Sequence, residues 1–195
     1  MSTPAAASRT RTVAQAGVVA AVYAAATLAV LQMPAQLGWG PVQLRVSEAL
    51  TVVALFTPAA IPGLALGTAL ANASLIAQVG PVGLLDVVFG SLATLLGAAW
   101  TWRFRSRMAL ALAGPVVTNA LIVPAYLPAM LAALGFAQEP FFGIDLGGSW
   151  LVMYIAGVVA IALGQVIVLY GLGWPLALLM RRTGLAGALG GAERR

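Results

Sequence analysis

The sequence predicts an all-α protein that crosses a membrane several times, and three observations predict it. Hydrophobic residues make up 62% of the 195 residues and charged residues only 8%. The mean hydropathy is +1.00. Ordinary soluble domains are about 45–50% apolar and about 25% charged. The apolar residues also gather in long runs, most of them near the length of about 20 residues at which an α-helix spans a bilayer.

Glycines and prolines divide the apolar sequence into six predicted transmembrane helices. The first run lacks a clear signal-peptidase pattern, so we expect it to remain as a spanning helix. Only Pro58 and Pro62 separate the second and third runs, and we expect a tight turn there rather than a kink in one long helix. The six expected helices are Val13–Met33, Val46–Phe56, Ala59–Gln78, Gly83–Phe104, Met108–Leu134 and Trp150–Met180.

The arginines predict the orientation of the helices. With six crossings and a cytoplasmic N-terminus, nine of the ten arginines face the cytoplasm and only Arg45 faces outward, as the positive-inside rule requires. Five crossings would separate the N-terminal arginines from those at 103–107. We therefore expect one transmembrane domain at 13–180 between cytoplasmic tails at 1–12 and 181–195.

Absent residue types exclude several kinds of chemistry. The chain has no cysteine and no histidine, which excludes disulfides, thiolate nucleophiles, imidazole bases and the usual zinc or haem ligands. It has no lysine, so it cannot form a glycine-rich phosphate loop of the usual kind. The net charge of +5 comes from arginines at helix ends, where it reports orientation rather than nucleic-acid binding. We expect no catalytic residue, no cofactor and no metal site.

A few polar residues beside or within the apolar runs are the candidates for a binding site, because ionisable groups at membrane depth usually pair with one another or contact a ligand. Each also has a structural explanation. Arg45 and Glu48 are close enough along the chain to pair with each other, and Ser47 can cap the second helix. Asp86 can cap the fourth helix, and the amides can join helices. The seven candidates, which we expect to converge on one cavity, are Arg45, Ser47, Glu48, Asn72, Asp86, Asn119 and Gln165.

Small residues dominate the first helix. Their small-xxx-small spacing lets another helix approach closely, either within the bundle or from a separate membrane protein. The sequence favours neither alternative. The residues are Ala16, Gly17, Ala20, Ala21, Ala24 and Ala25.

Four ordered motifs within Val13–Met180 carry a resemblance to a known family. They are GPVQLRVSEAL at 40–50, AIPGLALG at 60–67 followed by Asn72, GLLDVVFGSLATLL at 83–96, and NALIVP at 119–124. With these motifs the chain resembles the QueT family, the predicted queuosine-precursor uptake proteins. These are substrate-binding S-components of energy-coupling-factor (ECF) transporters.

The resemblance implies a six-helix S-component in a prokaryotic plasma membrane. It would capture a deazaguanine-type queuosine precursor, or queuine, from outside. A transmembrane coupling protein and two ATPase subunits would be its partners, with docking on the alanine face of the first helix. The motif positions imply substrate contacts by Arg45, Ser47, Glu48, Asn72, Asp86 and Asn119, and lids at Pro34–Gln43 and before Trp150.

One position departs from the family pattern. The resemblance implies an acidic residue at the position of Gln165, as in many members of the family. Here Glu48 or Asp86 would have to accept hydrogen bonds from the substrate instead. Two alternatives remain open. One is an S-component for another purine-like base or a vitamin, and the other is an intramembrane aspartic enzyme that pairs Asp86 with Asp145.

Overall fold

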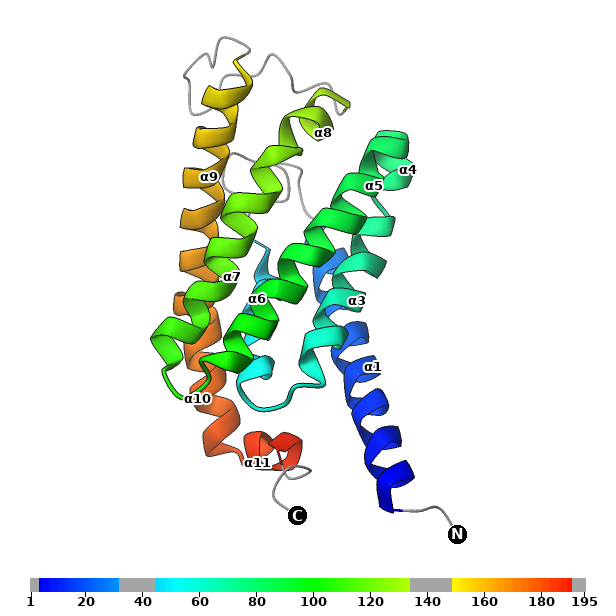
Figure 1. Cartoon of the computed structure of the whole chain (residues 1–195), viewed down its shortest axis with the longest axis vertical. Helices are drawn as coiled ribbons and strands as arrows, with labels where there is room; N and C mark the ends of the chain where they lie inside the picture. Colours follow the sequence, from blue (N-terminus) through cyan, green and yellow to red (C-terminus); the bar gives the residue numbers. More distant parts are fainter. Residues whose placement is uncertain (1–3, 32–44, 134–148, 191–195) are drawn as a thin grey trace.

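The structure, a computed structural model, describes residues 4–31, 45–133 and 149–190 and is all-helical over these ranges (Figure 1). The predicted lids, and with them Asp145, lie outside the described residues. The long helices are α1 (Pro4–Leu31), α3 (Ala60–Ala73), α6 (Ser91–Arg103), α7 (Met108–Ile122) and α9 (Trp150–Val166). The shorter α-helices are α4 (Ile76–Val79), α5 (Gly83–Leu85), α8 (Leu127–Ala133), α10 (Trp174–Arg182) and α11 (Leu185–Gly190).

Several segments are helical but not α-helical. Three are 3₁₀ helices, namely η1 (Val46–Leu55), η2 (Gly80–Val82) and η4 (Val123–Ala125), and two are π-helices, namely η3 (Asp86–Gly90) and η5 (Ile167–Gly173). A 3₁₀ run of 10 residues is unusual, because such runs rarely exceed about 3–4 residues. The sequence did not predict these changes of helix type.

All six expected runs are helical in their described parts, but their boundaries differ from the expected ones. α1 begins at Pro4, inside the expected N-terminal tail, and α11 lies inside the expected C-terminal tail. The expected third, fourth, fifth and sixth helices are each divided into shorter segments. The proline pair at 58 and 62 does mark a turn, since residues 56–59 separate η1 from α3.

By length and apolar composition, the described residues contain four helices that could cross a membrane. One of them, Ala60–Arg103, has 44 residues, about twice the length that a crossing needs. The chain reverses within it near Gly80, whose φ of 67° suits only glycine. As a result α3 and α6 lie side by side in Figure 1 and pack against each other. The four stretches are Ser8–Val30, Ala60–Arg103, Met108–Ala125 and Trp150–Arg182.

Helices α1 and α3 pack with their backbones almost in contact. A Cβ atom added to Gly63 would lie 2.7 Å from the carbonyl oxygen of Ala16, and one added to Gly67 would lie 2.7 Å from that of Ala20. Only glycine fits at such distances. One stripe of small residues on α1 therefore packs inside the bundle, whereas the neighbouring Gly17 is exposed.

The segment η1 occupies the centre of the bundle. Every residue from Ser47 to Leu55 except Leu50 is buried. Its apolar side chains pack with Tyr23 of α1, Leu64 of α3 and Leu112 of α7 in one cluster. The core thus holds the chain immediately after Arg45 in a fixed position.

A proline inside α7 is compensated by a neighbouring helix. Pro115 has no N–H, so the carbonyl of Ala111 lacks its usual helical donor. The hydroxyl of Thr101 on α6 lies 3.0 Å from this carbonyl oxygen and is fully buried. This contact joins α6 to α7 at the point where the ladder of α7 is interrupted.

The two described chain ends meet at one end of the bundle (Figure 1). Arg11 and Gln15 of α1 donate hydrogen bonds to the carbonyls of Ala188 and Leu189 in α11. Thr57, just after η1, donates to the Gln15 side chain at 3.3 Å. The other end of η1, where Arg45 stands, therefore points away from the chain ends.

Candidate functional site

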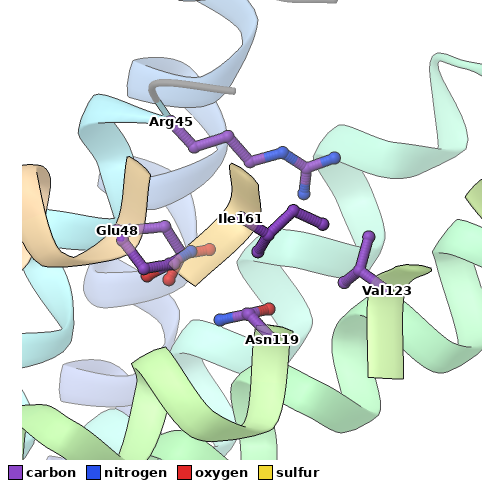
Figure 2. Close-up of a pocket in the computed structure, with 6 residues that line it drawn as sticks. Arg45, Glu48, Asn119, Val123 and Ile161 are labelled. Atoms are coloured by element: carbon purple, nitrogen blue, oxygen red, sulfur yellow. The ribbon is translucent and has the colours of Figure 1, made fainter. Parts of the chain in front are cut away.

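A pocket lies where the N-terminal end of η1 meets α7, η4 and α9 (Figure 2). The empty space in and around it is about 280 Å³ with open solvent included, of which about 10 Å³ admits the centre of a water-sized molecule, room for about one water. In Figure 2 the side chains of Arg45 and Asn119 approach it from opposite sides. Four of the seven candidate residues line it, together with two apolar ones; the full set is Arg45, Glu48, Asn119, Val123, Ile161 and Gln165.

Arg45 forms an ion pair with Asp86, with 2.9 Å between a guanidinium nitrogen and Oδ2. The hydroxyl of Tyr126 donates to the other carboxylate oxygen, Oδ1, at 2.6 Å. The expected pairing of Arg45 with Glu48 is therefore wrong, because Arg45 reaches across to the chain after Gly80 instead. Asp86 makes no capping hydrogen bond, so the capping interpretation is also wrong.

Glu48 has a different partner and a free oxygen. The hydroxyl of Tyr23 donates to Oε1 of Glu48 at 2.6 Å. The second oxygen, Oε2, is buried and makes no hydrogen bond of good geometry among the described residues, although the Thr51 hydroxyl, which also lacks a partner, lies near the carboxyl group. Since Glu48 is only 2% exposed and lines the pocket, this oxygen is an unused acceptor at the site.

Ser47 lies beside Glu48 but does not line the pocket. Its hydroxyl is hydrogen-bonded to that of Thr27 at 2.7 Å. No side-chain capping bond is present at the start of η1, so the proposed cap by Ser47 is wrong. Ser47 instead joins η1 to α1.

Asn72 holds the backbone of Asp86, one partner of the ion pair. Its side-chain nitrogen donates to the backbone carbonyl of Asp86 at 2.9 Å, which confirms the interhelical role that is common for membrane amides. Gly90 leaves room for this arrangement, because a Cβ there would lie 2.6 Å from Oδ1 of Asp86 and 2.9 Å from the Asn72 nitrogen. Neither Asn72 nor Asp86 lines the pocket.

The two remaining candidates, Asn119 and Gln165, both line the pocket. Asn119 donates to the carbonyl of Pro115 in its own helix at 3.0 Å, so it does not join helices through this bond. Gln165 is 7% exposed, and its Oε1 has no hydrogen-bond partner among the described residues. It provides a second unused acceptor.

The site lies next to both π-helical segments. Asp86 is the first residue of η3, and Gln165 stands two residues before η5 begins. Such segments widen a helix locally and occur often at functional sites. As a result, the side chains after each π-helical segment lie at different positions from those in a continuous α-helix.

Sequence reasoning missed the two tyrosines that hold the carboxylates. Tyr23 and Tyr126 lie within apolar helical runs and are buried. A buried tyrosine hydroxyl usually finds a partner, and in a chain with so few acceptors a carboxylate was the obvious one. That signal was present in the sequence.

The arrangement suits binding rather than reaction. Two buried acceptors, Oε2 of Glu48 and Oε1 of Gln165, lack donors in one pocket whose lining also includes Arg45, Asn119 and two apolar side chains. Unpaired buried polar atoms are costly, and a ligand with N–H groups would supply the missing partners. Among the described residues, groups of three or more acidic, cysteine or histidine side chains that could hold a metal ion are absent.

Comparison with known proteins gives one match, to a family. Neither the curated proteins nor the solved structures give a match. A family model described as QueT transporter matches residues 13–182 and so covers most of the chain. All seven candidate residues fall within the matched range. The chain therefore belongs to the QueT transporter family.

Proposed function

We propose that this membrane transport protein is the substrate-binding S-component of an ECF-type importer that takes up a queuosine precursor or queuine. The observation that carries the proposal is the pair of unpartnered acceptors, Oε2 of Glu48 and Oε1 of Gln165, in one small pocket. Membership of the QueT transporter family supports the role in transport.

A deazaguanine fits the chemistry of this pocket. Its six-membered ring carries a ring N–H and an exocyclic amino group side by side, and this edge donates two or more hydrogen bonds. Glu48 provides a carboxylate acceptor for that edge, as the departure at Gln165 requires. The apolar Val123 and Ile161 offer flat contacts to the ring.

The two carboxylates have different roles in this proposal. Both oxygens of Asp86 already have partners, Arg45 and Tyr126. Asp86 therefore holds Arg45 at the edge of the pocket, and Glu48 contacts the substrate. Ser47 and Asn72 support these two residues, while Asn119 and Gln165 contact the substrate directly.

We propose six crossings with both chain ends in the cytoplasm of a prokaryotic cell. The reversal near Gly80 supports two crossings within Ala60–Arg103, and η1 would form a short one at the centre. The meeting of α1 and α11 supports chain ends on one side. The pocket would then open to the outside, because Arg45 stands at the end of η1 that points away from the chain ends.

Uptake would use ATP hydrolysed by partner subunits, since a chain without lysine lacks the usual phosphate loop. A coupling protein would dock on the outer face of α1. There the exposed Gly17 and Ala21 leave a shallow surface for another helix. Nothing in the site favours the aspartic enzyme, because the Asp86 carboxylate is fully engaged.

The proposal is tested by purifying the protein and identifying small molecules that accompany it by mass spectrometry. Queuine and its deazaguanine precursors are then titrated by tryptophan fluorescence. We expect binding tighter than micromolar for at least one of them. Tighter binding of another purine-like base or vitamin would replace the substrate and keep the S-component. Absence of any ligand, and of coupling and ATPase subunits on mild extraction, would reject both.

A further inference from the structure

Tyr23 stands behind the pocket rather than in its wall. It is fully buried, it belongs to α1, and it is not among the residues that line the pocket. Its hydroxyl donates to Oε1 of Glu48 at 2.6 Å. Within the described residues, Oε1 thus has a hydrogen-bond donor, whereas Oε2 of the same carboxylate has none.

A single strong donor on one oxygen fixes where the other oxygen lies. A glutamate side chain has several rotatable bonds, and ordering them on ligand binding weakens affinity. A hydrogen bond of 2.6 Å removes that freedom before the ligand arrives. The carboxylate of Glu48 thus presents Oε2 to the pocket in one orientation.

A second bond in the same place strengthens the link between α1 and η1. Thr27, one turn after Tyr23 on α1, is hydrogen-bonded to Ser47, the neighbour of Glu48. Both α1 residues are buried. Two consecutive residues of η1 are therefore held by two side chains on one face of α1.

The other buried tyrosine–carboxylate pair provides the contrast. Tyr126 donates to Asp86, but there Arg45 takes the second oxygen, so the pair is closed to a ligand. At Glu48 the second oxygen remains open. The tyrosine hydroxyl therefore completes a closed structural contact at Asp86, whereas at Glu48 it leaves one acceptor open.

We propose that Tyr23 is a positioning residue, which orients the Glu48 carboxylate toward the N–H edge of the substrate. The inference rests on the proposed function, in which Glu48 contacts that edge. It assigns to α1 a part in substrate recognition although α1 does not reach the pocket.

The test compares Tyr23→Phe with Tyr170→Phe. Tyr170 also loses a hydroxyl that has a protein partner, the carbonyl of Ala109 at 2.7 Å, but away from the pocket. We expect Tyr23→Phe to raise the Kd for queuine by about tenfold, since the loss of one buried hydrogen bond has an effect of this size. Tyr170→Phe is expected to bind as the unmodified protein does. Equal affinity in all three proteins would overturn the inference and leave the proposed function standing.

A second measurement separates positioning from packing. 7-Deazahypoxanthine differs from 7-deazaguanine only in lacking the exocyclic amino group, so the ratio of their two affinities reports how well the acceptor is aimed. Tyr23→Phe is expected to reduce this discrimination, whereas a merely structural role would lower both affinities alike. No binding of queuine by the unmodified protein would instead reject the proposed substrate, and this inference with it.

Should Tyr23→Phe fail to fold, the comparison moves to the Glu48→Gln background, where the hydroxyl faces a neutral amide. There we expect Tyr23→Phe to change the Kd by less than about twofold, because the carboxylate it orients is gone. A further tenfold loss would show that Tyr23 acts on something other than Glu48 and would overturn the inference.

Discussion

Arg45 and Asp86 stand 41 residues apart in the chain and form a 2.9 Å ion pair beside the pocket. The pair ties the start of η1 to the start of η3. Asp86 is almost completely buried and the Arg45 side chain is 20% exposed. The contact therefore lies mostly out of water, where an unpaired partner is costly.

Arg45→Ala is expected to destabilise the protein strongly. It leaves a buried carboxylate without its cation, a change that costs about 3–5 kcal/mol when the pair is fully buried. We expect a value near the lower end because Arg45 is partly exposed. The measurement is the free energy of unfolding in detergent, with the exposed Arg107→Ala as control. Arg45→Met combined with Asp86→Leu should lose less than Arg45→Ala alone, and an equal loss would contradict the ion pair.

Gln165→Leu is expected to stabilise the protein and weaken binding at the same time. The change replaces an unpartnered buried oxygen with apolar atoms of similar size, which we expect to add about 1 kcal/mol of stability. Queuine affinity should fall because an acceptor is lost. The matched control is Asn72→Leu, which breaks a satisfied bond to Asp86 and should destabilise by about 1–3 kcal/mol. Thermal unfolding measures the stability of the two variants, and a fluorescence titration measures their affinity for queuine. Equal destabilisation by the two changes would contradict the absence of a partner for Oε1 of Gln165.

Gly67→Ala is expected to force α1 away from α3. The added methyl group would lie 2.7 Å from the carbonyl oxygen of Ala20, and overpacking of this kind costs about 1–3 kcal/mol. Gly17→Ala is the control, since a Cβ there meets nothing within 4 Å, and it should be neutral or slightly stabilising. Circular dichroism during heating compares the two variants. Similar unfolding temperatures would mean that the two helices do not pack as described.

Thr101→Val is expected to matter mainly because of Pro115. The hydroxyl serves the Ala111 carbonyl that the proline leaves without a donor, so its loss should cost about 1–3 kcal/mol. In a Pro115→Ala background the helix supplies its own donor, and the same change should cost less. A double-mutant cycle on unfolding free energies gives the coupling, and strict additivity would contradict this compensation.

Much of the fold could be predicted from the sequence, because apolar run length and proline position act locally. The turn at Pro58 and the helical nature of all six runs follow from such local rules. The division of Met108–Leu134 at η4 does not, since Pro124 alone does not tell whether a helix kinks or changes type. The π-segments depend on packing across the bundle and leave no clear pattern in the sequence.

The candidate site stays a prediction, although some of its residues do come together. Of the seven candidates selected by the scarcity of polar residues, Arg45, Glu48, Asn119 and Gln165 line one pocket and the other three do not. The partners were harder to predict. Residues three apart in sequence, such as Arg45 and Glu48, suggest a local pair, but Arg45 pairs with Asp86, 41 residues further along the chain. Side-chain partners depend on which helices become neighbours, and a single sequence does not fix that.

Gly63 and Gly67 let the α1 backbone approach α3 closely, and Tyr23 on the same α1 helix reaches Glu48. Helices α1 and α3 are therefore fitted to each other, because the glycines of α3 leave room for the backbone of α1. A chimera that exchanges only one of them with a relative would spoil recognition even if every residue of the pocket were retained. Transplanting specificity between members of this family should begin by moving both helices together.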